Sequence, residues 1–326
     1  MVDLTTRLGS LTLPNPVLTA SGCAAAGREL GQFFDVAALG AIVTKSIMVE
    51  PRSGRPTPRM AETPSGMLNS IGLQGPGIDA FIEHDLAWLA EHGARTVVSI
   101  AGGHTDEFVE LARRLYGNPA VSMLEVNISC PNVESRGQVF ACDVSASARV
   151  ISAVRRAADP RIPVFAKLTP DVTDIAAIAR ACADAGVNGF SMINTLLGMV
   201  IDTDTMAPAL GGITGGLSGP AIRPVAVRCV WQVHRALPHL PILGMGGIQT
   251  GSDALQFILA GASAVSIGTA VFGDPGAPLR VLAELEQELG ERGFASLSDA
   301  VGFAHLDRFA RAARRPAEAT ASAVRR

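Results

Sequence analysis

Eight short apolar runs, separated by stretches with helical spacing, constrain the fold of this chain more than any other feature. The runs cover residues 17–20, 41–46, 96–101, 123–129, 164–168, 189–194, 242–245 and 264–268. The stretches between them place apolar residues at helical spacing, as Phe108, Leu111 and Leu115 do. Strands that are apolar along their whole length are typical of parallel strands covered by helices. Eight such units predict a closed barrel.

The first run argues against the runner-up, an open doubly wound sheet. The first strand of that open fold leads into a G-x-G-x-x-G turn. Here the first run leads into residues 21–24, whose sequence Ser-Gly-Cys-Ala does not match that turn. Residues 4–13 are expected to form a small hairpin that caps the barrel floor. The predicted fold class is therefore α/β, a (β/α)8 TIM barrel with a small N-terminal hairpin.

Composition excludes several other classes of protein. Hydrophobic residues make up 48% of the chain and charged residues 17%, which excludes a disordered chain and a charged coiled coil. The formal net charge of −3 provides no broad basic field for nucleic acid. The five cysteines are widely spaced and form no C-x-x-C pattern, so we expect neither a disulfide framework nor a metal site. Without an apolar run of ~18 residues, we expect a cytoplasmic protein with no membrane span.

Polar residues and glycines gather where the runs end. The carboxyl ends of barrel strands are where such folds place their chemistry. The residues found there are Ser21, Lys45, Ser99, Asn127, Cys130, Lys167, Asn194, Gly246, Gly247, Gly268 and Thr269. Because the runs are defined by apolarity alone, this agreement predicts a functional site at that end of the barrel.

Glycine turns and lysines at the strand ends suggest an anionic ligand. Glycines in residues 244–248 and 266–270 would let backbone N–H groups approach a phosphate, although tight turn packing is the alternative. Lysine is rare, since Lys45 and Lys167 are the only two among 27 basic residues. Each would place a compact cation at a strand end, suited to an anion or to a reduced cofactor. A Schiff base and a solvated surface lysine remain open as alternatives.

One cysteine and several asparagines add candidate chemistry on the same face. Cys130 precedes a proline just past the fourth run, where a thiolate could act as base or nucleophile if its surroundings lower its pKa. The amides of Asn69, Asn127, Asn132 and Asn194 each offer a donor and an acceptor to a planar ligand. Any one of them alone is more commonly a turn former.

Six motifs together resemble the dihydroorotate dehydrogenase family over roughly residues 4–305. They are residues 44–52, 64–74, 127–132, 166–170, 194–199 and 214–220, with the two glycine turns completing the match. The resemblance implies an FMN-dependent barrel that oxidises dihydroorotate to orotate in pyrimidine biosynthesis. A cysteine at position 130 and the early first strand are similar to the soluble classes rather than to the membrane-bound one, which has an N-terminal extension and a serine base.

Residues 72–74 and 194–219 resemble the NAD-linked, two-subunit class, known as class 1B. This resemblance implies an electron-transfer partner that carries FAD and a 2Fe-2S cluster. It also implies a heterotetramer of two catalytic and two electron-transfer chains, built on a homodimer of the catalytic chain.

The resemblance also implies roles for individual residues. Cys130 would remove a proton from C5 of dihydroorotate while hydride leaves C6, and Lys167 would stabilise charge on the reduced flavin. The implied substrate-binding residues are Lys45, Asn69, Ser70, Ile71, Gly72, Leu73, Asn127, Asn194 and Thr195. The implied FMN-binding residues are Ser21, Lys45, Ser46, Ser99, Asn127, Lys167, Ile193, Gly219, Gly246, Gly247, Gly268 and Thr269. Residues 131–142 resemble the family's mobile loop, with Gly137 as a hinge.

Two positions depart from the family pattern. Gly75 replaces the usual asparagine after the Gln74 position, and Ser99 stands where asparagine is usual, which leaves room for a shifted substrate range or flavin potential. We expect one FMN-binding barrel over residues 1–311 and a disordered, Ala/Arg-rich tail over residues 312–326. The alternatives are an FMN-dependent reductase of another dihydropyrimidine, a non-redox Schiff-base lyase and a non-catalytic scaffold subunit.

Overall fold

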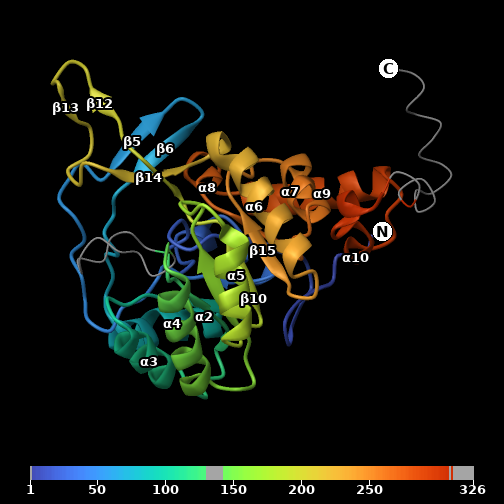
Figure 1. The fold of residues 1–326 in the computed structure, drawn as a ribbon, viewed down its shortest axis with the longest axis horizontal. Helices are drawn as coiled ribbons and strands as arrows, with labels where there is room; N and C mark the ends of the chain where they lie inside the picture. The colour runs from blue at the N-terminus through green and yellow to red at the C-terminus, as the bar shows by residue number, and fades with distance from the viewer. Residues whose placement is uncertain (1, 130–141, 308–309, 311–326) are drawn as a thin grey trace.

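A closed barrel of parallel strands forms the centre of the molecule (Figure 1). The computed structural model describes residues 2–129, 142–307 and 310. Within them the barrel strands are β3 (Val17–Thr19), β4 (Ile42–Val43), β7 (Thr96–Ile100), β8 (Val121–Val126), β9 (Val164–Leu168), β10 (Gly189–Met192), β15 (Ile242–Met245) and β16 (Ala264–Ile267). Their order is β3-β16-β15-β10-β9-β8-β7-β4, and a parallel bridge between Leu18 and Ala41 closes the ring. The predicted barrel is confirmed, and each apolar run overlaps one strand.

Both faces of every barrel strand are buried, which explains why the runs are apolar throughout. Successive side chains on a strand point to opposite faces. Val97, Met123 and Phe165 are fully buried in the cluster that fills the barrel interior. Their neighbours Val98 and Leu124 belong instead to the cluster that packs against the helices. A solvent-facing sheet would have required polar residues at alternate positions.

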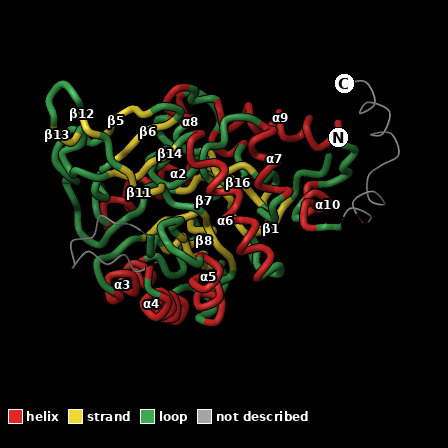
Figure 2. Tube along the Cα trace, turned by 45° about the horizontal axis from the view of Figure 1, so that its top comes forward, coloured by secondary structure: helices red, strands yellow, loops and turns green. Residues whose placement is uncertain are grey.

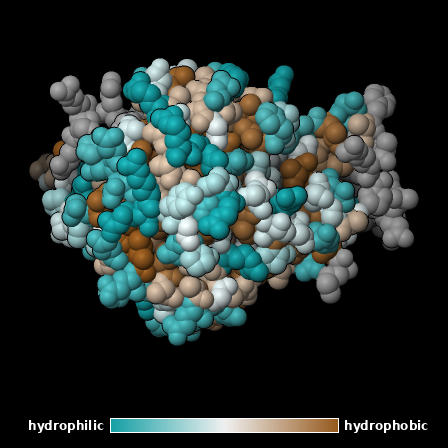
Figure 3. All heavy atoms as spheres, turned by 90° about the horizontal axis from the view of Figure 1, so that it is seen from below, coloured by the Kyte–Doolittle hydropathy of each residue, from teal (hydrophilic) through white to brown (hydrophobic). Residues whose placement is uncertain are grey.

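Helices surround the strands, as Figure 2 shows for α3, α4 and α5 along one side. The longer helices are α3 (Thr105–Arg114), α4 (Val144–Ala157), α5 (Ile175–Asp184), α6 (Arg223–Ala236), α7 (Gly251–Leu259) and α9 (Ala277–Glu291). The shorter ones are α1 (Ile78–Ala80), α2 (Ala87–Glu91), α8 (Ala270–Gly273) and α10 (Leu297–Ala300), and a π-helical stretch over Phe81–Leu86 joins α1 to α2. Phe108 and Leu111 are buried on α3, as their spacing predicts. The face seen in Figure 3 is largely hydrophilic, with hydrophobic residues in small separate groups.

A two-stranded antiparallel hairpin closes the floor of the barrel. It consists of β1 (Thr6–Leu8) and β2 (Leu11–Leu13). Leu8 and Leu13 are fully buried and belong to the cluster inside the barrel. The hydroxyl of Thr6 donates to the carbonyl of Ser263 at 2.7 Å, which attaches the hairpin beside β16. The hairpin predicted over residues 4–13 is therefore confirmed.

A small antiparallel sheet covers the opposite end of the barrel and was not predicted. Its strands are β11 (Leu196–Gly198), β14 (Gly215–Ser218), β6 (Gly66–Asn69) and β5 (Met60–Thr63), in that order. A second hairpin, β12 (Ile201–Asp202) with β13 (Ala207–Pro208), projects beside it (Figure 1). The sheet joins segments that follow β4 and β10, far apart in the chain, so no local sequence pattern announces the pairing.

Two sequence predictions concern parts of the chain outside the described residues. The residues 131–141 of the predicted mobile loop, including Gly137, and the predicted tail over residues 312–326 both lie there. The division into one barrel and a tail therefore stays a prediction. No helix in the described ranges combines the length and the apolar character that crossing a membrane requires.

Candidate active site

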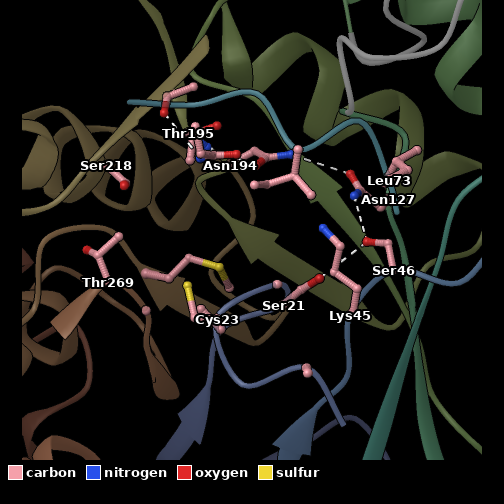
Figure 4. Close-up of a pocket in the computed structure, with 18 of the residues that line it drawn as sticks. Ser21, Cys23, Lys45, Ser46, Leu73, Asn127, Asn194, Thr195, Ser218 and Thr269 are labelled. Carbon is pink, nitrogen blue, oxygen red and sulfur yellow. Dashed lines mark hydrogen bonds between the residues drawn. The ribbon is translucent and has the colours of Figure 1, made fainter. Parts of the chain in front are cut away.

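A cavity of about 810 Å³ opens at the carboxyl ends of the barrel strands, beneath the antiparallel sheet (Figure 4). The predicted site residues that line it are Ser21, Lys45, Ser46, Asn69, Ile71, Gly72, Leu73, Asn127, Lys167, Ile193, Asn194, Thr195, Gly219, Gly246, Gly247, Gly268 and Thr269. Residues chosen from strand ends and motifs are thus brought together around a single space. Pockets of this size and mixed lining commonly hold small molecules.

Three other predicted site residues are not found in the cavity lining. Ser70 is buried behind the lining, where its hydroxyl is 3.5 Å from the guanidinium of Arg55. Ser99 is fully buried behind the lining, where its hydroxyl lies 2.9 Å from that of Ser46. Cys130 lies outside the described residues, so its role as a base stays a prediction.

Lys167 is a buried cation at the end of β9. Its side chain is 5% exposed, and its ammonium nitrogen is 3.5 Å from a carboxylate oxygen of the fully buried Glu125 on β8. The second lysine, Lys45, follows β4 and reaches the same cavity beside Ser21 and Ser46 (Figure 4). The alternative of a solvated surface lysine is therefore wrong for Lys167. Burial of the Lys167 ammonium strengthens its interactions with other charges.

Hydroxyl and amide groups form a continuous hydrogen-bonded wall on one side of the cavity (Figure 4). The side-chain nitrogen of Asn127 donates to Ser46 Oγ at 2.9 Å, and Ser46 Oγ is also 2.9 Å from Ser99 Oγ. The amide oxygen of Asn127 accepts from Ser129 Oγ at 3.0 Å. Ser129 Oγ in turn accepts from the side-chain nitrogen of Asn194 at 2.8 Å. The hydrogen bonds to Ser46 and Ser129 therefore fix the orientation of the Asn127 and Asn194 amides toward the cavity.

Strand β14 brings the other predicted substrate segments together. It pairs with β6, where Gly216 lies opposite Asn69, and with β11, where Gly216 lies opposite Leu197. The Asn69 side chain donates to the carbonyl oxygen of Gly216 at 3.2 Å. A Cβ on Gly216 would lie 2.0 Å from the hydroxyl of Thr195, so only glycine permits this approach. Asn69, at the end of β6, and Thr195, just before β11, therefore line the cavity from the two strands that flank β14.

The two glycine turns differ in why they lack side chains. Gly247 has φ +72°, and a Cβ there would lie 2.6 Å from the carbonyl oxygen of Gly219, so its turn geometry demands glycine. A Cβ on Gly268 would meet Ala20 at 3.4 Å and Cys23 at 3.5 Å, which are ordinary contacts. Packing therefore does not require a glycine at position 268, which lines the cavity, so its small size there favours a ligand.

An ion pair supports the first glycine turn from behind. Arg223 donates to the carbonyl oxygen of Gly247 at 3.0 Å and lies 2.8 Å from a carboxylate oxygen of Asp253. Asp253 also accepts from the backbone nitrogen of Gln249 at 3.1 Å. The turn is therefore held rigidly, as an anion-binding backbone requires.

The structure also places residues in or beside the site that sequence reasoning did not select. Cys23 lines the cavity, and burial raises the pKa of its thiol to about 11 although Lys167 and Lys45 lower it in part. Ser129 links two predicted asparagines. Glu125 could have been selected from the sequence, because it is the one charged residue in the apolar run over residues 123–129. Among the described residues, no group of three or more His, Cys, Asp or Glu side chains is arranged to hold a metal ion.

A closed barrel with a buried lysine, an ordered amide wall and glycines at its carboxyl end defines an α/β barrel with a cavity suited to a small polar molecule. Comparison with known families identifies the family within this class of barrel. The family model for dihydroorotate dehydrogenase matches residues 3–289 of the chain. The chain belongs to this family, which confirms the resemblance stated from its motifs.

Curated relatives are similar over nearly their whole length. One from Desulforudis audaxviator is 51% identical over 304 residues, covering 93% of this chain and 98% of the relative. One from Pelobacter propionicus is 51% identical over 300 residues, covering 92% and 98%. One from Geobacter sulfurreducens is 49% identical over 300 residues, covering 92% and 97%. Each is named dihydroorotate dehydrogenase B (NAD(+)), catalytic subunit.

Proposed function

We propose that this chain oxidises dihydroorotate to orotate in pyrimidine biosynthesis, as the FMN-binding catalytic subunit of an NAD-linked enzyme. The observation that carries the proposal is the single cavity that joins Lys167, Lys45 and the amide wall. Support also comes from the names of relatives that share about half of their residues with this chain along nearly their full length. Dihydroorotate is planar in part, with alternating N–H and C=O groups and a carboxylate, which matches amides and ammonium groups.

The residues present fit FMN. Gly246, Gly247 and Gly268 line the cavity with backbone, whose N–H groups would meet a phosphate. The ammonium group of Lys167 has three donors and pairs with Glu125 at 3.5 Å, so it can also meet the electron-rich edge of a flavin ring. When bound, FMN supplies the acceptor for the hydride that leaves the substrate.

The chain's own residues would orient the substrate and move its proton. Asn127 and Asn194 are held by Ser46 and Ser129, so their amides would bind the pyrimidine ring without reorganising. Lys45 would attract the carboxylate. Cys130, in the proposed role of base, would take the proton from C5.

A partner subunit belongs to the same proposal. The relatives' names contain the words "catalytic subunit", which supports a separate chain for electron transfer. We propose that this partner carries FAD and a 2Fe-2S cluster, in a cytoplasmic heterotetramer of two chains of each kind around a homodimer of the catalytic chain. Co-purification of the partner with a tagged version of this chain would test that assembly, and an NAD-active homodimer holding only FMN would contradict it.

Anaerobic titration of the purified chain tests the activity. The protein is loaded with FMN, and dihydroorotate is added while the flavin absorbance near its visible maximum is followed. Stoichiometric bleaching, with orotate as product, is expected for the wild-type chain. Cys130→Ser should retain FMN but reduce it far more slowly. Failure to bind FMN would overturn the proposal, whereas bleaching only by another dihydropyrimidine would favour the alternative reductase.

A further inference from the structure

Five polar residues form a buried layer inside the barrel, at the floor of the cavity. They are Ser99, Glu125, Lys167, Ser191 and Ser266, and each is buried as a whole residue. Glu125 stands two residues after Met123, and Lys167 two residues after Phe165, both of which fill the barrel interior. The two-residue repeat of a strand therefore points Glu125 and Lys167 inward as well. We name these five residues the interior polar layer.

Glu125 is the one anion of this layer. One carboxylate oxygen accepts from Ser99 Oγ at 2.9 Å and lies 3.5 Å from the Lys167 ammonium. The other oxygen is buried and has no hydrogen-bond partner among the described residues. Burying an ion is costly unless it is paired and fully hydrogen-bonded, so packing alone does not account for a carboxylate here.

The hydrogen bonds above Glu125 have only one consistent direction. A carboxylate only accepts, so the single proton of Ser99 points to Glu125. Ser46 must then donate to Ser99, at 2.9 Å, because the Ser99 proton is already used. With its own proton used, Ser46 can only accept, from the side-chain nitrogen of Asn127 at 2.9 Å and from the hydroxyl of Ser21 at 3.2 Å. The acceptor oxygen of Glu125 thus sets the direction of these hydrogen bonds, in which the nitrogen of the Asn127 amide points to Ser46.

We propose that Glu125 is a positioning residue of the active site, which holds Lys167 by charge and directs the hydrogen bonds that run through Ser99 and Ser46 to Asn127. One carboxylate then aligns both the cation that would meet the flavin and an amide that would meet the substrate. Its negative charge also offsets the charge of Lys167 near the bound cofactor. The inference rests on the proposed function.

The midpoint potential of bound FMN tests this role independently of turnover. Glu125→Gln keeps the shape and can still accept from Ser99, but it removes the charge. We expect the two-electron equilibrium to shift about tenfold toward reduced flavin, equivalent to a rise of about 30 mV. Ser191→Ala, a neutral change in the same layer, serves as the matched control and should leave the potential unchanged.

Further measurements separate a positioning role from a merely structural one. In Glu125→Leu, which removes the acceptor as well, the KM for dihydroorotate should rise more than in Glu125→Gln, because the Asn127 amide loses its direction. If neither variant folds, Glu125→Asp withdraws the carboxylate by one methylene and should shift the potential in the same direction but less. An unchanged potential in a folded, FMN-loaded Gln or Asp variant overturns the inference. A wild-type chain that binds no FMN overturns the proposed function instead.

Discussion

The side-chain nitrogen of Asn194 lies 2.8 Å from the hydroxyl oxygen of Ser129, so loops that follow β8 and β10 share one hydrogen bond. Ser129 also donates to Asn127, and it therefore ties both amides of the cavity wall. A single hydroxyl thus stabilises the arrangement that would recognise a pyrimidine ring.

Replacing that hydroxyl should weaken substrate binding. In Ser129→Ala the two amides lose their shared partner, and we expect the KM for dihydroorotate to rise about tenfold, the equivalent of one hydrogen bond. FMN content should stay at the wild-type level. Steady-state kinetics and flavin absorbance measure the two quantities, and Ser152→Ala, which loses a surface hydrogen bond on α4, is the control. An unchanged KM would show that the wall does not contact substrate.

Lys167 should resist replacement even by arginine. The wide guanidinium fork is a poor substitute for an ammonium group at a buried site beside Glu125. We expect Lys167→Arg to slow flavin reduction by on the order of 100-fold, measured by anaerobic stopped-flow. Arg292→Lys changes an exposed ion pair on α9 and should leave the rate unaltered. Equal rates in the two variants would remove Lys167 from the mechanism.

Substitutions in the two glycine turns should have different effects, one on FMN binding and the other on stability. Gly268→Val places its Cβ at ordinary contact distance from Ala20 and Cys23, so the melting temperature should stay close to wild type while FMN binds at least about tenfold more weakly. Gly247→Ala should instead lower the melting temperature, because its φ of +72° and the nearby carbonyl oppose a Cβ. Calorimetry and flavin titration together distinguish the two effects. The reverse pattern would contradict this reading of the two turns.

Cys23 should be unreactive at neutral pH. With a thiol pKa of about 11, about one side chain in 1,000 is ionised at pH 8, and only the thiolate is alkylated. The rate of carboxamidomethylation at Cys23, followed by peptide mass spectrometry, should therefore rise roughly tenfold per pH unit from pH 7 to pH 10. Rapid labelling at pH 7 would be incompatible with this pKa.

His234 should make the fold acid-sensitive. Burial lowers the pKa of His234, and the neighbouring His305, whose ring centroid is 4.9 Å away, lowers it further. The unfolded chain therefore binds a proton more readily, so this contribution to stability is present above about pH 6.5 and is lost as the pH falls below it. Between pH 7.5 and pH 5, the melting temperature of wild type should fall more than that of His234→Gln. Parallel declines would exclude His234 as the cause.

The barrel was predictable because its strands are buried on both faces, which leaves a local apolar signal in each run. Lys167 and Asn127 could be selected because polar residues at the ends of such runs are conspicuous. The antiparallel sheet could not, since β14 pairs with strands distant in the chain and its Gly-Gly-Leu-Ser sequence has no strand pattern. Ser129 was missed for a related reason, because its importance lies in a contact with Asn194, 65 residues away.

The position of β14 between two paired strands has a practical consequence for engineering substrate range. Gly215 and Gly216 would each bring a Cβ within 2.7 Å of neighbouring atoms that belong to the segments around Asn69, Leu210 and Thr195. Side chains at these two positions would clash with the neighbouring segments, so mutagenesis libraries that include them would mostly yield proteins with a disrupted cavity rather than new specificities. Gly75 lines the same cavity, and its Cβ would meet only one atom, at 3.9 Å, so it is the position at which diversity can be introduced first.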